Sequence, residues 1–521
     1  MRDSCLLSAL LFVFLVPSVA RAQPGRGTLP GQGPTPTPVA EVAVRAADAR
    51  PAPPAVDNYK QTQHTSRVGG QPVAYTATAG TLALKSAAGK PRANVFFVAY
   101  AKDGASSGTR PIAFVFNGGP GSASVWLHMG LVGPKRVQMA DDGFQPAPPY
   151  DLVDNDDSLL DVADVVAIDA VSTGYSRMVE GEDGKNFHGV RQDIEAFSDF
   201  IRLYLTRFNR WASPKYLLGE SYGTVRSAGL SADLQSRHGI ELNGIILVSS
   251  VIDFSTLSEA PGNELNYASF LPTYTADAWY HKRLSPDLQS QDIRKVVDDA
   301  RQFVWGEYMS ALIKGSRLSA AERKDMASKV ARLTGLSAEF VEQANLRVSP
   351  GRFRKELLRD KRLTVGRLDG RYTAHDRDAA GETSEFDPSN TALQGAYTAL
   401  FSDYVRNELK WESDLQYYTS GNVRPWEYEQ GRYLNLIDNL RSAMARNPYL
   451  NVLVANGYYD MATPFAGTEY TFEHVGFEKT YADRISLTYY EGGHMMYIRP
   501  NMLKALKNDM AQFIKRTQAG K

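Results

Sequence analysis

Apolar and polar residues follow two different periods along the chain, and these periods predict strands and helices in turn. Continuous apolar runs at 112–116, 162–170, 216–218 and 245–251 predict buried strands. Between Val190 and Phe208 the apolar residues recur at helical spacing, which predicts an amphipathic helix. Buried strands that alternate with helices are typical of a mostly parallel sheet covered on both faces. The pattern therefore predicts an α/β fold.

The alternation stops after about residue 255. Residues 285–445 are charged and rich in helical periodicity, and two strand-like runs and an amphipathic helix then follow. We predict that a helical insertion, 256–445, divides one α/β domain into a first part, 56–255, and a second part, 446–521. We expect this insertion to form a lid over a site at the strand ends.

The first 55 residues follow neither period. Residues 1–22 combine a short charged start, an apolar run of about 14 residues and an Ala-Arg-Ala ending, which predicts a secretory signal peptide. That run is too short to span a bilayer comfortably. Residues 23–55 are rich in Pro, Gly, Ala and Thr and predict a disordered leader. We expect an exported protein, periplasmic or secreted, with no membrane segment after processing.

Composition narrows the class of protein further. Lys plus Arg and Asp plus Glu both number 58, so a nucleic-acid partner is not expected. The single cysteine, Cys5, lies inside the predicted signal peptide, so the mature chain should contain no disulfide. No Asn-x-Ser/Thr sequon occurs, and these two features together favour a bacterial envelope. No zinc-ligand spacing appears, and we expect neither metal nor cofactor.

A candidate nucleophile follows the apolar run at 216–218. Gly219, Ser221 and Gly223 form a Gly-x-Ser-x-Gly pattern, and a small-residue helical stretch comes next. In a nucleophile elbow the serine occupies a strained strand-to-helix turn, where flanking side chains would clash. The spacing alone equally fits an ordinary glycine-rich junction. The strand before it and the helix after it favour the elbow.

A serine nucleophile needs a base, and the base needs an acid that orients it. In elbow hydrolases these follow the serine in chain order, acid first, each after a strand. Asp460 follows the strand-like run at 450–455, and His494 follows the next run on a glycine-rich loop. His474 lies in a predicted helix, and Asp483 precedes a strand, so neither is as well placed. We predict a triad of Ser221, Asp460 and His494.

The tetrahedral intermediate of acyl transfer needs two backbone donors for its oxyanion. The N–H group of Tyr222, directly after the nucleophile, would supply one. The glycine-rich loop 117–121 has the right character for the other. A phosphate-binding loop is the alternative for these glycines, but neither Gly-Lys-Ser/Thr nor Gly-x-Gly-x-x-Gly is present.

Together these motifs resemble the serine carboxypeptidase family, peptidase family S10. They are Asn-Gly-Gly-Pro-Gly-Ser at 117–122, Gly-Glu-Ser-Tyr-Gly at 219–223, Asn-Gly-x-x-Asp at 456–460 and Gly-His-Met at 493–495. A looser match occurs at 169–176, and the resemblance extends from about 70 to 515. It implies an α/β-hydrolase fold, and an enzyme that removes C-terminal amino acids from peptides through an acyl-enzyme.

The resemblance also implies a role for each motif residue. Ser221 would be the nucleophile, His494 the general base and then acid, and Asp460 its orienter. The backbone N–H groups of Gly119 and Tyr222 would hold the oxyanion.

Two further residues would bind the terminal carboxylate of the substrate, namely Asn117 and Glu220. Glu220 must then be protonated, because two like charges cannot share one site. A buried acid that only shapes the elbow is the alternative for Glu220.

The chain departs from the family pattern near the glycine loop. Phe116 and Ser122 stand where the family usually has Trp and Cys, which fits a disulfide-free, bacterial-type branch. Family members commonly carry an acid in the segment corresponding to 125–134, where His128 is the only ionisable residue. His128 could contact substrate or simply pack. An esterase or acyltransferase with the same triad therefore stays open, and a non-catalytic binding protein or a metal-dependent peptidase is a more distant alternative.

Overall fold

The computed structural model describes residues 56–518, with gaps at 107 and 477. The predicted signal peptide, 1–22, and leader, 23–55, lie outside the described residues. Among the helices that are described, none has the length and apolar character needed to cross a bilayer.

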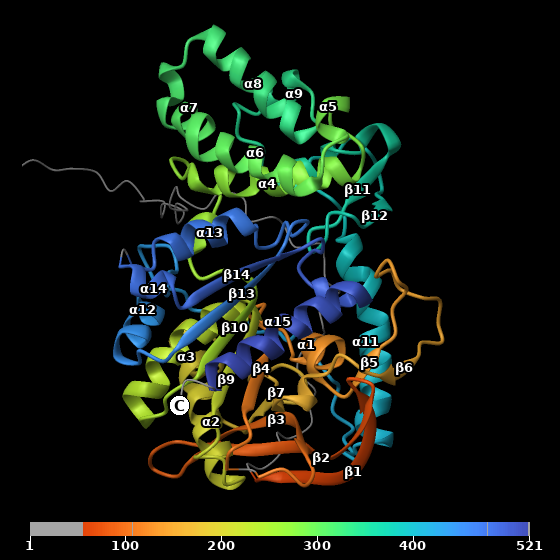
Figure 1. Ribbon diagram of the computed structural model, residues 1–521, viewed down its shortest axis with the longest axis vertical. Helices are drawn as coiled ribbons and strands as arrows, with labels where there is room; N and C mark the ends of the chain where they lie inside the picture. Colours follow the sequence, from red (N-terminus) through yellow and green to blue (C-terminus); the bar gives the residue numbers. More distant parts are fainter. Residues whose placement is uncertain (1–55, 107, 477, 519–521) are drawn as a thin grey trace, which may run out of the picture.

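A ten-stranded sheet forms the centre of the molecule (Figure 1). Three antiparallel strands make one side of it, namely β1 (Asn58–Val68), β2 (Gln71–Lys85) and β3 (Pro91–Lys102). Parallel strands continue the sheet in the order β7 (Asp164–Ile168), β4 (Ile112–Phe116), β9 (Lys215–Ser221), β10 (Gly244–Ser250), β13 (Asn451–Gly457) and β14 (Ile485–Tyr490). Short β8 (Arg177–Met178) pairs with β3. The strands predicted from apolar runs are confirmed.

Alternate residues of each central strand point to opposite faces of the sheet. On β9, Leu217 packs with α2 (Val190–Arg207), α3 (Tyr222–His238) and α12 (Ile437–Arg446). Its neighbours Tyr216 and Leu218 pack on the other face with α1 (Val125–Leu127), α11 (Pro388–Asn407) and α15 (Pro500–Gln518). Both faces are therefore buried, which explains the continuous apolar runs. The small pair β5 (Lys135–Val137) and β6 (Leu152–Asp154), with α13 (Phe465–Glu473) and α14 (Lys479–Ala482), completes the core domain.

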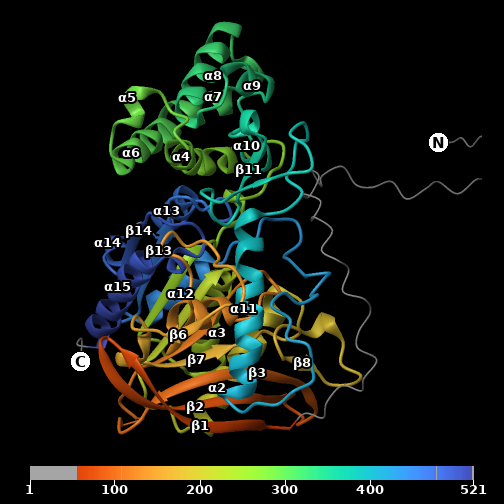
Figure 2. The same ribbon diagram turned by 90° about the vertical axis from the view of Figure 1, so that its right-hand side faces the viewer.

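A helical lid, residues 265–375, stands at one end of the sheet (Figures 1 and 2). It has a hydrophobic core of its own. Its elements are α4 (Leu265–Tyr280), α5 (Pro286–Gln289), α6 (Ile293–Phe303), α7 (Met309–Lys314), α8 (Ala320–Thr334), α9 (Ala338–Gln343), α10 (Pro350–Glu356) and the hairpin β11 (Leu363–Val365) with β12 (Thr373–His375). After the lid, α11 returns along the core. The topology is that of the α/β-hydrolase fold, interrupted by a helical insertion.

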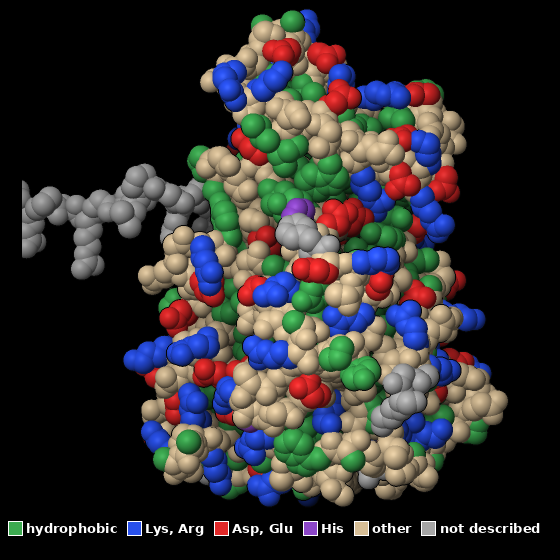
Figure 3. Space-filling view, turned by 60° about the vertical axis from the view of Figure 1, so that its left-hand side comes forward, with side chains coloured by type: hydrophobic (Ala, Val, Ile, Leu, Met, Phe, Trp, Pro, Cys, Tyr) green, Lys and Arg blue, Asp and Glu red, His purple; other side chains and the backbone are tan. Residues whose placement is uncertain are grey.

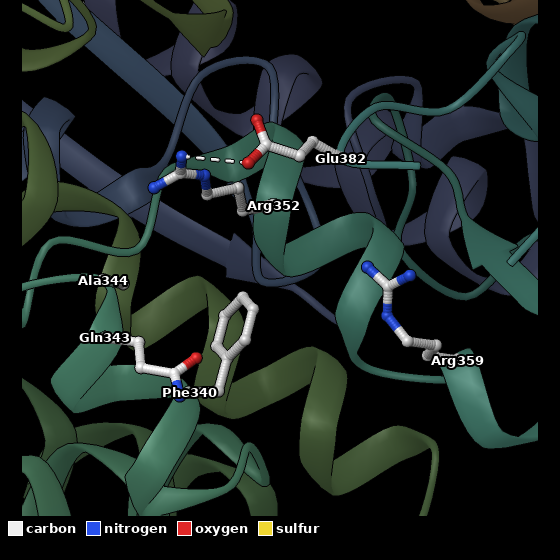
Figure 4. Close-up of a pocket in the computed structure, with 6 residues that line it drawn as sticks. All are labelled: Phe340, Gln343, Ala344, Arg352, Arg359 and Glu382. Atoms are coloured by element: carbon white, nitrogen blue, oxygen red, sulfur yellow. Dashed lines mark hydrogen bonds and ion pairs between the residues drawn. The ribbon is translucent and has the colours of Figure 1, made fainter. Parts of the chain in front are cut away.

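A cavity of about 210 Å³ is lined by lid residues and by Glu382, which follows the lid in the sequence (Figure 4). Arg352 and Glu382 pair across it at 3.2 Å. Arg359, which also lines it, is held by Glu356 at 2.5 Å and by backbone carbonyl groups. Each of these charged groups thus has a partner. On the face drawn in Figure 3, Lys and Arg side chains are likewise mixed with Asp and Glu.

Candidate active site

The sequence motifs meet at the carboxyl edge of the parallel strands. Phe116, the last residue of β4, pairs with Gly219 of β9, so the glycine loop leaves the sheet beside the elbow. Ser221 pairs with Ser250 at the end of β10. The neighbouring Ser249 donates a hydrogen bond from its hydroxyl to the carbonyl oxygen of His494 at 2.7 Å. Loop 117–121 and His494 are more than 370 residues apart in the sequence. The fold brings both to the same edge of the sheet.

Ser221 occupies a strained turn between β9 and α3. Its φ of 59° and ψ of −130° are rare for a residue with a side chain. A Cβ atom on Gly219 would lie 2.3 Å from the carbonyl oxygen of Gly223, and one on Gly223 would lie 2.8 Å from that of Phe116. Only glycine fits at both positions. This is the geometry that the Gly-x-Ser-x-Gly pattern predicts.

His494 and Asp460 form a buried pair. The Nδ1 atom of His494 lies 2.8 Å from Oδ2 of Asp460. Asp460 is 0% exposed and His494 is 4% exposed. Burial by itself would lower the pKa of His494, but the adjacent Asp460 carboxylate outweighs it, and the net pKa is raised. With Nδ1 facing the acid, Nε2 remains as the atom that can accept a proton.

Asp460 is itself fixed by its own loop. Its Oδ1 accepts hydrogen bonds from the backbone N–H groups of Ala462 at 2.8 Å and Thr463 at 3.0 Å. Its Oδ2 accepts a third from the Thr463 hydroxyl at 2.6 Å. Sequence reasoning missed Thr463, whose backbone N–H and hydroxyl both bond the acid. The acid is held in one orientation before any substrate arrives.

The glycine loop lies directly against the first turn of α3. A Cβ atom on Gly118 would sit 2.3 Å from the backbone nitrogen of Tyr222. Tyr222 is the first residue of α3, where backbone N–H groups have no acceptor within the helix. Gly119 has a φ of 104°, a conformation that favours glycine. The loop thus presents backbone beside the elbow, as a second oxyanion donor requires.

Two other segments hold the glycine loop in place. Asp169, fully buried, accepts hydrogen bonds through Oδ1 from the backbone N–H of Ser124 at 2.8 Å and from its hydroxyl at 2.7 Å. The segment that follows α11 adds two main-chain bonds, from Ala123 N–H to Thr419 at 3.0 Å and from Gly421 N–H to Gly121 at 2.7 Å. The support from the segment after α11 could not be predicted from the sequence, because main-chain hydrogen bonds do not depend on side-chain identity.

Asn117 and Glu220 touch each other beneath the elbow. Asn117 Nδ2 donates to Glu220 Oε1 at 2.8 Å, and Asn117 Oδ1 accepts from the N–H of Leu127 at 3.0 Å, which fixes the amide orientation. The other carboxyl oxygen of Glu220 accepts from the Tyr497 hydroxyl at 2.6 Å. Sequence reasoning missed Tyr497, which lies three residues after His494. These contacts form a small polar network around one buried acid.

The environment of Glu220 favours its neutral form below about pH 7. The residue is 3% exposed, and burial raises its pKa to about 7, although the charge of His494 and the donors Tyr497 and Asn117 oppose that rise. Burial also raises the pKa of Tyr497 well above its usual value, so this hydroxyl stays protonated and donates. Below pH 7 the network therefore offers neutral donors to a bound anion.

A buried ion pair supports the backbone of Asn117. Arg226 of α3 binds Asp193 of α2 through Nε at 2.8 Å and Nη2 at 3.2 Å. Its Nη1 donates to the Asn117 carbonyl oxygen at 2.6 Å. The guanidinium also lies 4.3 Å from the ring centroid of Phe197. Two helices of the core thus fix the start of the glycine loop.

The remaining histidine and acid candidates bond to residues outside this cluster. His128 is 1% exposed, its Nε2 is 2.6 Å from the Tyr100 hydroxyl, and burial lowers its pKa to about 3. It is a packed, neutral histidine that faces the aromatic core. His474 is exposed and bonded to the Tyr470 carbonyl oxygen at 2.6 Å, and exposed Asp483 lies beside Lys479. The described residues contain no group of three or more potential metal ligands.

Comparison with known proteins identifies the family. The serine carboxypeptidase family model matches residues 70–506. No curated protein sequence matches the chain. Similar solved structures include a thermophilic esterase from Thermogutta terrifontis (11% identity, 84% of this chain and 99% of that chain, TM-score 0.35) and a carboxyl esterase from Bacillus coagulans (13%, 84% and 99%, 0.35). A third is juvenile hormone epoxide hydrolase from Bombyx mori (10%, 85% and 79%, 0.33). The match over residues 70–506 shows that the chain belongs to the serine carboxypeptidase family of hydrolases.

Proposed function

We propose that this hydrolase is an exported, disulfide-free serine carboxypeptidase of bacterial type that removes C-terminal amino acids from peptides. The observation that carries this proposal is Glu220. A buried acid, with a pKa of about 7, stands next to the nucleophile and is bonded to Asn117 and Tyr497. An acid that stays neutral in this position can donate a hydrogen bond to a substrate carboxylate, and a charged one cannot.

In the first half of the reaction Ser221 attacks the carbonyl carbon of the last peptide bond. Its hydroxyl proton passes to Nε2 of His494, whose Nδ1–H group donates to Asp460. Backbone N–H groups of Tyr222 and Gly119 receive the oxyanion. His494 then gives its proton to the leaving amine, and the C-terminal amino acid departs. The shortened peptide remains as an ester on Ser221.

In the second half a water molecule attacks this ester. His494 takes a proton from the water through Nε2, and the same two N–H groups hold the second oxyanion. Collapse of the intermediate returns the proton to Ser221 and releases the peptide acid. The buried Asp460 stabilises the imidazolium in both halves.

The terminal carboxylate of the substrate would bind to Asn117 and Glu220. Asn117 Nδ2 carries two hydrogens, and one of them is used for Glu220. Protonated Glu220 can donate while its oxygens still accept from Asn117 and Tyr497. Binding to the carboxylate selects the last peptide bond, because it sets the distance from the chain end to Ser221.

An esterase or acyltransferase is the second candidate. His128, the only ionisable residue in segment 125–134, packs in the core and is bonded to Tyr100. Carboxylate recognition therefore lacks a contribution from that segment and depends on Asn117 and Glu220. The same triad would then serve substrates without a free carboxylate.

Matched peptides separate these two functions. We expect KM for a blocked dipeptide with a free C-terminus to be about fourfold higher at pH 7.5 than at pH 5, because only about a quarter of Glu220, with a pKa of about 7, keeps its proton at pH 7.5. Its C-terminally amidated twin should be a poor substrate at both values. Released amino acid is measured by chromatography, with Ser221→Ala as the background. Equal cleavage of the amide, or hydrolysis of esters only, would point to the second candidate.

Export is a proposal that rests on residues 1–22. A signal peptide that ends in Ala-Arg-Ala would be removed after Ala22. We expect N-terminal sequencing of the protein recovered from the envelope or medium to begin at Gln23. Retention of Met1 in a cytoplasmic fraction would contradict export.

A further inference from the structure

One stretch of the lid, residues 366–371 between β11 and β12, is bonded to the loop that carries Asp460. The Met461 N–H donates to the carbonyl oxygen of Arg367 at 3.1 Å. The Gly370 N–H donates to the carbonyl oxygen of Tyr459 at 2.9 Å. Asp460 lies between the two residues that make these bonds. The lid thus holds both sides of the catalytic acid.

The same stretch is bonded to the loop that carries His494. The His494 N–H donates to the carbonyl oxygen of Leu368 at 2.6 Å. At Gly493 a Cβ atom would lie 2.5 Å from that carbonyl oxygen and 2.5 Å from Cβ of Asp369. The histidine loop therefore lies flush against the lid, and Gly493 permits that approach.

Arg371 joins the stretch and both loops with one side chain. It is buried, and its Nε donates to Asp369 Oδ1 at 2.8 Å while Nη2 bonds the other carboxyl oxygen. Its Nη1 donates to the carbonyl oxygen of Glu491, in the histidine loop, at 3.1 Å. Its guanidinium carbon lies 5.0 Å from the ring centroid of Tyr459, in the acid loop. A planar guanidinium suits these three contacts, whereas the ammonium group of a lysine could not make the paired hydrogen bonds to Asp369.

Helix α4 of the lid packs against residues 366–371. Asp277 is 0% exposed, and a Cβ atom on Gly370 would lie 2.1 Å from its Oδ1. Neither carboxyl oxygen of Asp277 has a hydrogen-bond partner among the described residues. Burial, with the charge of Asp369 adding to it, raises the pKa of Asp277 well above its usual value. Arg371 therefore takes Asp369, and not Asp277, as its counter-ion.

We propose that Arg371 is a positioning residue through which the lid fixes the His494–Asp460 pair. It touches no reacting atom. It sets the separation of two loops whose side chains must stay 2.8 Å apart. A misplacement of about 1 Å in such a pair can lower the rate about 100-fold. The lid is then part of the catalytic support as well as a cover, and this inference rests on the proposed triad.

The test compares Arg371→Met and Arg371→Lys in the full-length enzyme. We expect kcat to fall about 30-fold in the Met variant and less in the Lys variant, while KM changes less than threefold because Asn117 and Glu220 do not contact Arg371. Arg354→Met is the matched control, since this lid arginine donates to Val365 at 3.1 Å, inside the lid. It should leave kcat unchanged.

The pH profile distinguishes positioning from a merely structural role. The groups that act on the charge of His494 are Asp460 and Glu220, which raise its pKa, and Arg367, which lowers it. A looser contact with Asp460 lowers the pKa of His494, so the acid limb of kcat/KM should move to lower pH in both Arg371 variants. A lower Tm with an unmoved acid limb and unchanged kcat would overturn the proposal.

Labelling by a fluorophosphonate separates this proposal from the proposed function. The reagent reports on the activated serine and needs no peptide. If the wild-type enzyme is labelled but cleaves no peptide, the carboxypeptidase assignment fails, and the Arg371 variants are judged by labelling rate. Equal labelling rates in wild type and both variants would then refute the positioning role.

Discussion

Asp460→Asn is expected to lower kcat about 10⁴-fold without unfolding the enzyme. In the native loop Oδ1 of Asp460 accepts from the N–H groups of Ala462 and Thr463. The same donors would hold the amide oxygen of the new side chain, so its NH₂ group would face His494. The Nδ1 atom would then have to accept, which places the imidazole proton on Nε2. That tautomer cannot take the proton of Ser221.

Steady-state cleavage of the blocked dipeptide measures this loss. Ser221→Ala sets the background rate, because its kcat is expected to be about 10⁶-fold lower than that of wild type. Asp483→Asn is the control, because this exposed acid pairs with Lys479 across one turn of helix and should leave kcat unchanged. A kcat within tenfold of wild type for Asp460→Asn would mean that another group orients His494.

The strands and the positions of the candidate motifs after them were predictable because their signals are local. A strand buried on both faces must be apolar throughout, as in β4, where every residue is buried. The elbow needs glycines at two fixed positions around Ser221, and the structure shows why in the distances to neighbouring carbonyl oxygens. Chain order then placed Asp460 and His494 after the right strands.

The supports of the site were not predictable, because they join residues that are distant in sequence. Arg371 reaches a carbonyl oxygen 120 residues away, at Glu491, and a carbonyl group carries no sequence signal. The support of the glycine loop by Thr419 and Gly421 is main-chain bonding too. Tyr497 could have been noticed only by its nearness to His494, and many tyrosines are merely packed.

The role of His128 could not be predicted from the sequence either. A lone histidine in segment 125–134 fits a substrate contact and a packed side chain equally well. Burial decides between them. The aromatic residues around His128 are Tyr100 of β3 and Phe401 of α11, which come before and after it in the chain. Its neutral state at pH 7 removes it as an ionic partner for a carboxylate, and its Nε2 atom already contacts the Tyr100 hydroxyl.

Glu220→Gln is expected to remove the pH dependence of substrate binding. In the wild-type enzyme Glu220 is protonated below its pKa of about 7 and donates to the substrate carboxylate. Above pH 7 it becomes an anion beside another anion, so KM for a free-acid peptide should rise about tenfold per pH unit. The glutamine amide is neutral at every pH and keeps a donor there. Its KM should stay flat from pH 5 to pH 9, near the wild-type value at pH 5.

Two comparisons make this result specific to Glu220. An ester substrate without a free carboxylate should show a flat KM in both enzymes, so any remaining pH dependence in kcat belongs to His494. Tyr497→Phe removes a donor that lowers the pKa of Glu220, so the rise in KM should begin at higher pH than in wild type. If KM for the free acid rises equally in wild type and Glu220→Gln, then Glu220 only shapes the elbow. Carboxylate recognition would in that case have to come from neutral donors such as Asn117, and the enzyme would lack the acid-dependent selection of chain ends that distinguishes an exopeptidase from an esterase on this fold.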